Sequence, residues 1–395
     1  MELYDVLVIG GGPAGSHTAF ALACRGYKVV VLERNQHLGE KVSCTGIISK
    51  ECVDSFSIGD DVILRKVNSA SLVSPSGKVL RVWRAETQAC ILDRTAFDIA
   101  MAQRAKQKGV EYIPDSPVVD IEVGNNGVRA KTSSGGHEAI FEARAGVIAS
   151  GFGSGLSERL GMGSTSDFVT GAQAEVETSG IDEVEVYFGS EVAPGFFGWL
   201  VPTSEGMARM GLLSCRNPDF YLKRLAASLA VQGKITPGAF KVNYGAIPLK
   251  PLTRTCGDRV LVVGDAAGQV KPTSGGGIYY GLLCADIAAD TLHQALQDGD
   301  LSAKSLSRYE QRWGKKLKRE LKIGRWARKL FERLSDGQFD RIFDIIKDNG
   351  IDKDLLQTRD ITYDWHGKAV LRLMGYKMLL KTMNVVRMPF KASDN

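Results

Sequence analysis

The sequence contains no hydrophobic run as long as the roughly 18 residues that a membrane-spanning helix needs, so no spanning segment is expected. Cysteine is scarce as well. The seven cysteines are an odd number, and their scattered spacing matches neither a disulfide framework nor a metal site. That usage is typical of a reduced, cytosolic compartment. No signal peptide is expected, because residues 1–3 lead directly into a strand pattern.

Composition and charge are those of an ordinary globular protein. The 395 residues are 44% hydrophobic and 24% charged, which is enough to form two or three lobes with a large core. The formal net charge of +5 is modest, and the basic excess lies near the C-terminus. We expect no nucleic-acid partner, and no internal repeats are present.

The chain is organised around its first thirty-odd residues. Residues 4–9 form a short run rich in Val and Ile, which indicates a buried parallel strand. A G-x-G-x-x-G match follows at 10–15, and then a helix is expected over 16–25. Residues 28–32 predict a second buried strand. Strand, Gly-rich turn, helix and strand in this order predict a dinucleotide-binding unit.

Each glycine of the motif has a separate expected role. Gly10 permits the tight turn, Gly12 lets the backbone approach a pyrophosphate, and Gly15 lets the helix pack on the strand. The bare N–H groups at the start of the helix would then face the phosphates. Glu33, at the end of the second strand, has close to the expected spacing for an acid that binds ribose hydroxyls.

A loop at 39–46 follows the ribose acid and carries Cys44 between small polar residues and glycine. Such a loop can approach a flat ligand closely. A free cysteine is more often a buried structural residue, and position alone leaves these two interpretations equal.

Strand patterns interrupt the nucleotide-binding pattern twice and predict a second lobe with an antiparallel sheet. The expected strands after the first two are 69–74, 79–83, 111–113, 118–123, 128–132, 145–151, 171–176, 183–188, 196–201 and 208–213. Further helices are expected at 95–108, 220–231 and, after about 305, throughout the tail. The expected domains are a cofactor domain of 1–60, 91–165 and 250–300, a substrate domain of 61–90 and 166–249, and a helical domain of 301–395.

A second cofactor motif follows the buried strand at 258–263. Gly264-Asp265 ends this strand, and Gly275-Gly276-Gly277 precedes a helix that begins at Ile278. A carboxylate at a strand end can bind the hydroxyls of a ribityl chain. A Gly-rich helix N-terminus can stabilise negative charge on a reduced flavin. Together with the N-terminal motif, this pattern favours FAD over NAD.

Two apolar patterns remain open between a functional and a structural interpretation. The aromatic residues of 194–202 either line an apolar cavity or belong to the core, and the core is the commoner outcome. Residues 311–333 carry ten Lys or Arg against two Glu, with apolar residues at helical spacing. This segment is either a helix on an anionic membrane or one docked on the protein with a solvated basic face. Residues 368–391 are again basic and apolar.

With both cofactor motifs present, the whole chain resembles the geranylgeranyl reductase family, within the p-hydroxybenzoate-hydroxylase-like flavoproteins. Leu92-x-Arg94 is similar to the helix-start arginine that contacts FAD. Ser43-Cys44-Thr45-Gly46 is similar to the family's cysteine loop beside the flavin ring. Phe197-x-Trp199-x-Val201-Pro202 is similar to its aromatic substrate motif Tyr/Phe-x-Trp-x-Phe-Pro, with Val in place of Phe.

The resemblance implies an FAD ene-reductase that saturates C=C bonds of a prenyl chain on a lipid. Cys44, Phe197 and Trp199 are its expected catalytic residues. The residues expected to contact FAD are Gly10, Gly12, Ala14, Gly15, Glu33, Arg34, Cys44, Thr45, Gly46, Arg94, Val119, Gly264, Asp265, Gly276, Gly277 and Ile278. Neither a metal nor a second dinucleotide motif is expected. In related hydroxylases an Asp-Gly motif contacts flavin and NADPH, and this sequence has Ser150-Gly151 at that place. The resemblance therefore implies an external electron donor, either a ferredoxin or an NAD(P)H system.

Three other functions remain as alternatives. A flavin monooxygenase or halogenase would share the same cofactor motifs, and halogenases carry a similar Trp-containing motif. A dehydrogenase that feeds electrons to quinone would be expected to carry an iron–sulfur cluster near the C-terminus, but no cysteine follows Cys284. A prenyl-chain carrier without activity is the non-enzyme alternative. We expect the protein in the cytosol, with peripheral membrane contact through its basic tail.

Overall fold

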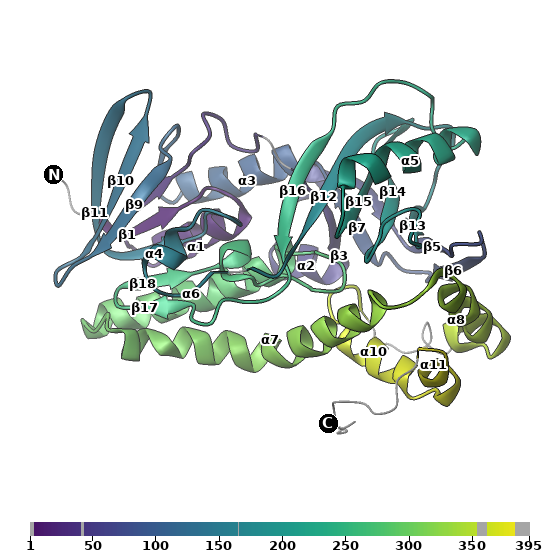
Figure 1. Cartoon of the computed structure of the whole chain (residues 1–395). Coiled ribbons are helices and arrows are strands. Elements are labelled where there is room, and N and C mark those ends of the chain that lie inside the picture. Colours follow the sequence, from purple (N-terminus) through teal and green to yellow (C-terminus); the bar gives the residue numbers. More distant parts are fainter. Residues whose placement is uncertain (1–3, 41–42, 165, 354–361, 384–395) are drawn as a thin grey trace. The chain divides into compact units, whose positions relative to one another are not determined.

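The computed structural model describes residues 4–40, 43–164, 166–353 and 362–383, and the chain divides into two compact units (Figure 1). The first unit comprises Met1–Val42, Asp93–Phe168 and Ile247–Leu321. The second comprises Ser43–Leu92, Val169–Ala246 and Lys322–Asn395. Lys41 and Val42 of the cysteine-containing loop and residues 384–391 of the second basic stretch lie outside the described residues.

The first unit is built on an eight-stranded sheet with the order β17-β18-β11-β1-β2-β8. Strand β1 pairs in parallel with both β11 and β2, and β10 and β9 extend antiparallel from β11. The strands are β1 (Tyr4–Ile9), β2 (Val29–Leu32), β8 (Glu111–Ile113), β9 (Val118–Val123), β10 (Val128–Ser134), β11 (His137–Ile148), β17 (Cys256–Gly257) and β18 (Val260–Val262). The helices are α1 (Pro13–Ala23), α3 (Arg94–Lys106), α4 (Leu156–Arg159), α6 (Ile278–Asp298) and the first part of α7 (Ala303–Phe331).

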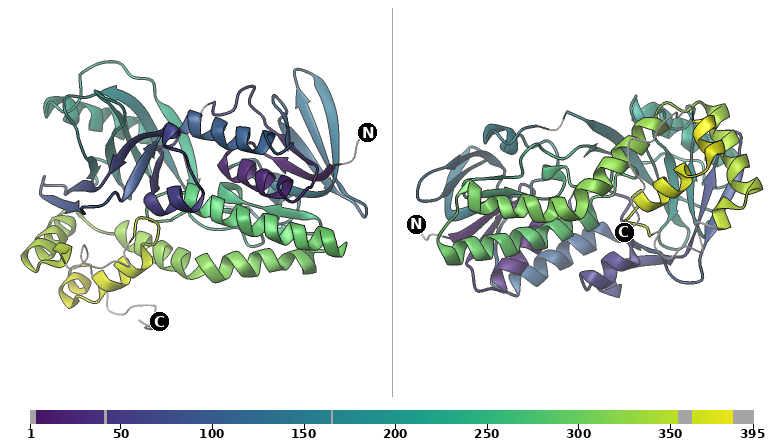
Figure 2. Two further views of the ribbon diagram at one scale, coloured as in Figure 1. Left: turned by 180° about the vertical axis from the view of Figure 1, so that it is seen from behind. Right: turned by 90° about the horizontal axis from the view of Figure 1, so that it is seen from below.

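The Val- and Ile-rich runs of the sequence form the centre of this sheet. The last four residues of β1 and all of β2 are buried, as expected for parallel strands covered on both faces. Helix α1 packs between α3 and α6, and Figure 2 shows α1 in purple beside α3 in blue and α6 in green. It begins at Pro13, before the expected Ser16, because proline is favoured in the first turn of a helix.

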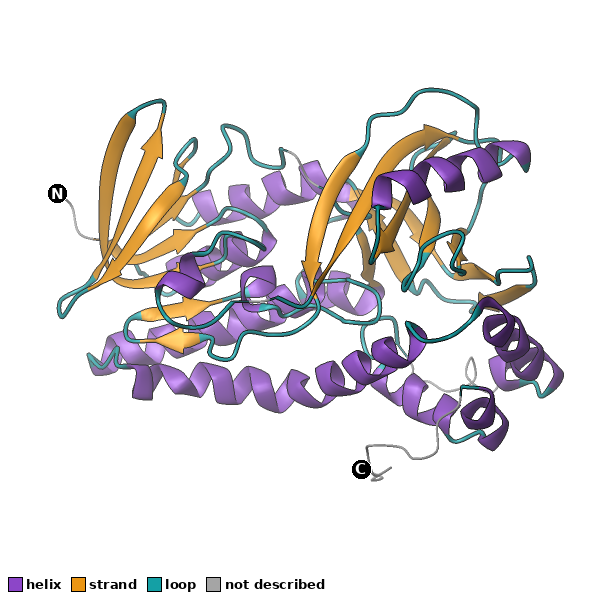
Figure 3. Cartoon of the chain, in the orientation of Figure 1, coloured by secondary structure: helices purple, strands orange, loops and turns teal. Residues whose placement is uncertain are grey.

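The second unit has a seven-stranded sheet with the order β16-β12-β15-β14-β13-β5-β6 and a three-stranded sheet with the order β3-β7-β4. Its strands are β3 (Ile47–Ser49), β4 (Ile63–Val67), β5 (Ser69–Val73), β6 (Val79–Trp83), β7 (Ala89–Leu92), β12 (Phe168–Glu177), β13 (Val184–Tyr187), β14 (Gly198–Pro202), β15 (Met207–Ser214) and β16 (Asn243–Pro248). Helix α5 (Pro218–Val231) packs on β15, as Figure 3 shows, and α2 (Lys50–Ser55) follows β3.

The described part of the C-terminal region is helical, as expected. After α7, the described helices are α8 (Asp336–Asp348), α10 (Gly367–Met374) and α11 (Lys377–Thr382). Ser335 and Gln338 form a capping box that starts α8. Residues 303–321 of α7 belong to the first unit and residues 322–331 to the second.

The expected fold class is confirmed: an α/β nucleotide-type unit, a second unit with a mainly antiparallel sheet, and a helical tail. One strand pair differs. Strand β13 runs parallel to β5, since a long excursion of the chain through the first unit separates them and no hairpin constrains their direction. The compact units assign residues 43–60 to the second unit and divide the tail between both units. The expected functional domains stay a prediction.

Candidate functional site

The Gly-rich turn after β1 is shaped by contacts that only glycine allows. Gly10 has a φ of +106°, and a Cβ there would lie 2.4 Å from the Ala149 carbonyl oxygen. A Cβ on Gly15 would lie 2.0 Å from the Gly10 carbonyl oxygen, so α1 packs directly on the turn. A Cβ on Gly12 would meet nothing within 4 Å. The first turn of α1 has neither a side-chain cap nor an acidic residue, so its N–H groups are suited to an anion.

Glu33 holds the turn from the end of β2. Its Oε2 accepts a hydrogen bond of 2.7 Å from the Gly11 N–H, and its Oε1 accepts one of 2.9 Å from the Asn35 N–H. The side chain is buried, whereas Arg34 beside it is exposed. The carboxylate is therefore fixed at the carboxyl end of the sheet, where dinucleotide-binding folds bind a ribose.

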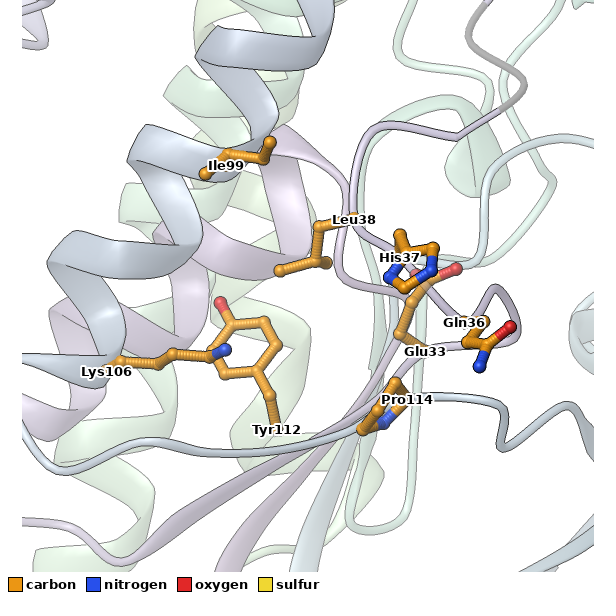
Figure 4. A pocket seen from close by; sticks show the side chains of 8 residues that line it. All are labelled: Glu33, Gln36, His37, Leu38, Ile99, Lys106, Tyr112 and Pro114. Atoms are coloured by element: carbon orange, nitrogen blue, oxygen red, sulfur yellow. The ribbon is translucent and has the colours of Figure 1, made fainter.

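A cavity of about 280 Å³ opens beside Glu33 within the first unit (Figure 4). Leu38, Ile99 and Pro114 contribute apolar surface, and the Lys106 ammonium lies 5.2 Å from the centre of the Tyr112 ring. Gln36 and His37 complete the lining. A mainly apolar hollow next to a carboxylate suits a flat ring joined to a hydroxylated sugar.

Arg94 lies one residue after the N-cap of α3 and forms a buried ion pair with Asp98 at 2.8 Å. Burial raises the pKa of Asp98, while the Arg94 guanidinium lowers it. The Asp93 side chain caps the helix by accepting from the Ala96 N–H. Val119, the other expected contact from the middle of the chain, lies exposed on β9.

The second cofactor motif is held by a buried hydrogen-bond chain. The Gly264 N–H donates to Gln269 Oε1 at 2.8 Å, and Gln269 Nε2 donates to the Tyr309 hydroxyl at 2.8 Å. That hydroxyl donates to the Val262 carbonyl at 2.9 Å. Gln269 and Tyr309 are fully buried, so helix α7 fixes the turn that carries Asp265.

Asp265 lies against the start of α6. A Cβ on Gly277 would lie 2.4 Å from Asp265 Oδ1, so no other residue fits there without displacing the carboxylate. Part of the Asp265 surface remains accessible, yet its surroundings raise its pKa through burial, and the Arg94 guanidinium opposes that rise. Gly277 is the N-cap of α6, whose first turn contains no acidic residue. Gly276 and Ile278, its neighbours, are partly exposed.

The two glycine motifs meet within the first unit. A Cβ on Gly264 would lie 3.1 Å from the Ala14 Cβ, and one on Gly281 would lie 3.6 Å from the same atom. One sheet and its helices therefore carry two helix N-termini without acidic residues. They also carry two carboxylates, Glu33 and Asp265. This arrangement can bind an elongated ligand with phosphates and several hydroxyl groups.

In the second unit, the cysteine loop is tied down by two neighbouring strands. Cys44 Sγ accepts from the Gly46 N–H at 3.4 Å, and the Cys44 carbonyl accepts from Gln173 Nε2 at 3.3 Å. Gln173 also accepts from the Thr45 hydroxyl at 3.0 Å. Arg209 Nη1 donates to the Thr45 carbonyl at 2.9 Å. The thiol therefore sits on an ordered, partly exposed loop.

The aromatic motif fixes Trp199 on the face of the second sheet. Trp199 pairs with Gly211 across β14 and β15, and a Cβ on Gly211 would lie 2.5 Å from the indole ring. The indole thus lies directly over bare backbone. Its Nε1–H is buried and has no hydrogen-bond partner among the described residues. Phe197 meets the Trp199 ring edge-on, with 6.1 Å between the ring centres.

Phe197 also connects the motif to the helical tail. The Phe188 ring lies 6.3 Å from Phe197 and 5.8 Å from both Phe331 and Phe339. The Arg328 guanidinium stacks 3.5 Å from the centre of the Phe196 ring. The core interpretation therefore holds for Phe196, which is buried, whereas Phe197 and Trp199 are partly exposed.

The apolar side of the basic helix faces the protein. Trp313, Leu317 and Leu321 are buried, and the Trp313 Nε1–H donates to the Thr255 hydroxyl at 2.9 Å. Lys315, Lys316 and Arg319 are exposed. In this part of α7 the structure agrees with the docked-helix interpretation, and the apolar stripe is not available for a membrane. Across the described residues, no helix combines the length and apolarity that a membrane span requires.

The structure adds four residues that sequence reasoning missed: Gln173, Arg209, Gln269 and Tyr309. None belongs to a local motif, and their partners are far away in the sequence. All seven cysteines are free thiols. Within the described ranges, no cluster of His, Cys, Asp or Glu is arranged to hold a metal ion.

Comparisons with known proteins identify the class. Residues 4–178 match the model of the pyridine nucleotide-disulphide oxidoreductase family. A geranylgeranyl bacteriochlorophyll reductase-like protein from Thermoplasma acidophilum superposes with a TM-score of 0.85 at 24% identity, covering 97% of this chain and 99% of that protein. A p-nitrophenol 4-monooxygenase from Pseudomonas putida superposes with a TM-score of 0.69 at 20% identity, covering 98% and 100%. These likenesses show that the chain shares the fold of these proteins.

The chain is also 32% identical over 355 residues to a digeranylgeranylglycerophospholipid reductase from Methanothermobacter thermautotrophicus, covering 86% of this chain and 90% of the relative. It therefore belongs to the geranylgeranyl reductase family, whose members are FAD-dependent oxidoreductases that act on C=C bonds of isoprenoid chains. The expected family, enzyme class and cofactor are confirmed.

Proposed function

We propose that this protein reduces C=C bonds in the geranylgeranyl chains of a membrane phospholipid. The convergence of the two glycine motifs and two carboxylates within the first unit supports the cofactor part of this proposal. The 32% identity to a digeranylgeranylglycerophospholipid reductase along most of the chain supports the substrate part.

The residues of the first unit fit FAD. Gly10, Gly12, Ala14 and Gly15 would hold the pyrophosphate and Glu33 the ribose hydroxyls, and the adjoining cavity would receive the adenine. Contacts from Arg34, Arg94 and Val119 complete that half of the site. Asp265 holds the ribityl hydroxyls, and the N-terminus of α6 at Gly276, Gly277 and Ile278 favours negative charge on the flavin. The chemistry that FAD would supply here, when bound and reduced, is hydride transfer to one alkene carbon.

The residues of the second unit receive the prenyl chain. Phe197 and Trp199 provide apolar surface that aligns it, with the indole orientation fixed by Gly211. Cys44 is the proposed donor of the proton for the other alkene carbon, and Thr45 and Gly46 are further proposed contacts of FAD. An isolated alkene is a poor hydride acceptor, so the positioning of the reacting groups contributes much of the rate enhancement.

The electron donor and membrane contact are further parts of the proposal. The N-terminal motif is the only dinucleotide-binding match in the sequence, which favours an external donor such as a ferredoxin or a separate NAD(P)H-dependent reductase. The exposed basic residues of α7 provide electrostatic contact with an anionic membrane that carries the substrate.

Anaerobic reoxidation of the chemically reduced protein tests this function. Geranylgeranyl-bearing phospholipid should reoxidise the flavin, and the product mass should rise by two hydrogens for each bond reduced. If prenyl lipids leave the flavin reduced while a small aromatic compound is hydroxylated or halogenated in the presence of oxygen, the monooxygenase or halogenase alternative is correct. A protein that binds prenyl lipid but contains no reducible flavin would be a carrier.

A further inference from the structure

Tyr363 lies in the segment between α8 and α10, far from the aromatic motif in sequence. In the second unit its ring packs against the same buried cluster as Trp199. The buried members of that cluster are Val67, Ala89, Ile91, Val184 and Val201. The helical tail therefore contributes a ring to the surroundings of the candidate substrate motif.

The alternation of side chains along β14 defines which face this is. Trp199 and Val201 point to one face of the sheet, and Leu200 between them points to the other and joins a different core cluster. Tyr363 thus packs on the face that carries Trp199. Val201 is the position at which this sequence has a smaller residue than the family motif, and Val201 and Tyr363 belong to the same cluster.

The surroundings of Tyr363 keep its ring in place and uncharged. Its carbonyl lies 2.7 Å from His366 Nε2, and the next residue but one, Trp365, donates to Glu51 Oε1 at 3.5 Å. Burial raises the pKa of Tyr363, and the nearby Asp364 carboxylate and Cys44 thiol raise it further. The phenol is neutral at physiological pH and can present its ring to an apolar ligand.

We infer that Tyr363 is a specificity-determining residue. Its ring and the ring of Trp199 form an aromatic wall for the prenyl chain, and the size of the Val201 side chain sets the width of the space beside that wall. This inference rests on the proposed function. The ring, rather than the hydroxyl, carries the effect, because an isoprenoid chain offers no hydrogen-bond partner.

Substrate kinetics with prenyl lipids of two, three and four isoprene units test the role of the ring. Tyr363→Ala should raise KM for the longest chain by about tenfold and reduce the preference for it, with unchanged FAD content. Tyr363→Phe should behave like the unmodified protein. Tyr376→Ala is the matched control, because Tyr376 packs in a separate cluster with Ile345, Ile351 and Leu379. Unchanged chain-length preference in Tyr363→Ala would overturn the inference.

A thermal unfolding cycle tests the shared space without any substrate. Val201 is fully buried, so Val201→Phe should lower Tm by overpacking. The same change in a Tyr363→Ala background should lower Tm much less, because the missing ring leaves space for the phenylalanine. Additive changes would show that the two side chains do not share this volume and would overturn the inference. Failure of the unmodified protein to reduce any prenyl lipid would instead contradict the proposed function and leave this cycle unaffected.

Discussion

At the scale of single residues, the candidate cofactor site depends on two carboxylates that lie close to backbone groups. Glu33 is held by two N–H donors, and Asp265 lies so close to Gly277 that a Cβ there would displace its carboxylate. Burial raises the pKa of Asp265 and Arg94 opposes this rise, so a bound hydroxylated ligand would gain a carboxylate that is only partly solvated. Such a group forms stronger hydrogen bonds than one in water.

The first prediction concerns Asp265. Asp265→Ala should weaken FAD binding by roughly ten- to a hundredfold, because a hydrogen bond to a charged group contributes about 1.5–3 kcal/mol. Titration of apoprotein with FAD, followed by flavin fluorescence, measures the change. Asp298→Ala, which removes an exposed carboxylate at the other end of α6, is the control. Equal FAD affinity in the two variants would exclude the assigned role of Asp265.

The second prediction concerns Cys44. Cys44→Ser should leave FAD content and Tm intact but slow prenyl reduction by roughly 10²-fold or more, the usual contribution of a positioned proton donor. Single-turnover reoxidation of the reduced protein measures the step. Cys24→Ser, at an exposed cysteine after α1, should react at the unmodified rate. If Cys44→Ser does so too, the thiol is structural.

At the scale of elements, local sequence patterns were sufficient to predict the strands, turns and helices that neighbouring residues determine. The buried strands, the turn at 10–15 and the helix after Gly277 follow from short runs of apolar residues and glycine, and the structure contains them with small shifts at their ends. The parallel pairing of β13 with β5 and the buried chain from Tyr309 to Gly264 could not be predicted. These contacts join residues far apart in the sequence, and no spacing rule encodes such a partner.

The third prediction tests that chain. Tyr309→Phe removes the hydroxyl between Gln269 and the Val262 carbonyl and leaves both groups unsatisfied in a fully buried setting. The free energy of unfolding in urea should fall by about 1–3 kcal/mol, and FAD affinity should fall with it because the turn that carries Asp265 loses its support.

Tyr244→Phe is the matched control for Tyr309→Phe. The Tyr244 hydroxyl donates to Asp219 at 2.7 Å on an exposed surface, so its loss should change stability by less than about 0.5 kcal/mol. A Tyr309→Phe variant with the same stability and FAD affinity as this control would show that helix α7 does not support the second motif.

At the scale of the whole molecule, the distribution of charge constrains how the protein reaches a lipid substrate. The net charge is only +5, but residues 311–333 alone carry ten basic residues against two acidic ones. The apolar stripe of that segment is buried at Trp313, Leu317 and Leu321. Membrane contact through the described part of α7 would therefore be electrostatic, without insertion of its apolar side.

The last prediction follows from that geometry. The protein should bind vesicles that contain anionic lipid and should dissociate at about 0.5 M salt, because surface charges are screened over only a few ångströms there. The triple change Lys315→Gln, Lys316→Gln and Arg319→Gln should weaken binding by more than tenfold, since each basic residue near the surface contributes about 1 kcal/mol. The control removes three exposed lysines elsewhere, Lys108→Gln, Lys241→Gln and Lys250→Gln, and should retain binding. Vesicle sedimentation measures both, and binding that persists in high salt would mean that apolar insertion, rather than charge, holds the protein on the membrane.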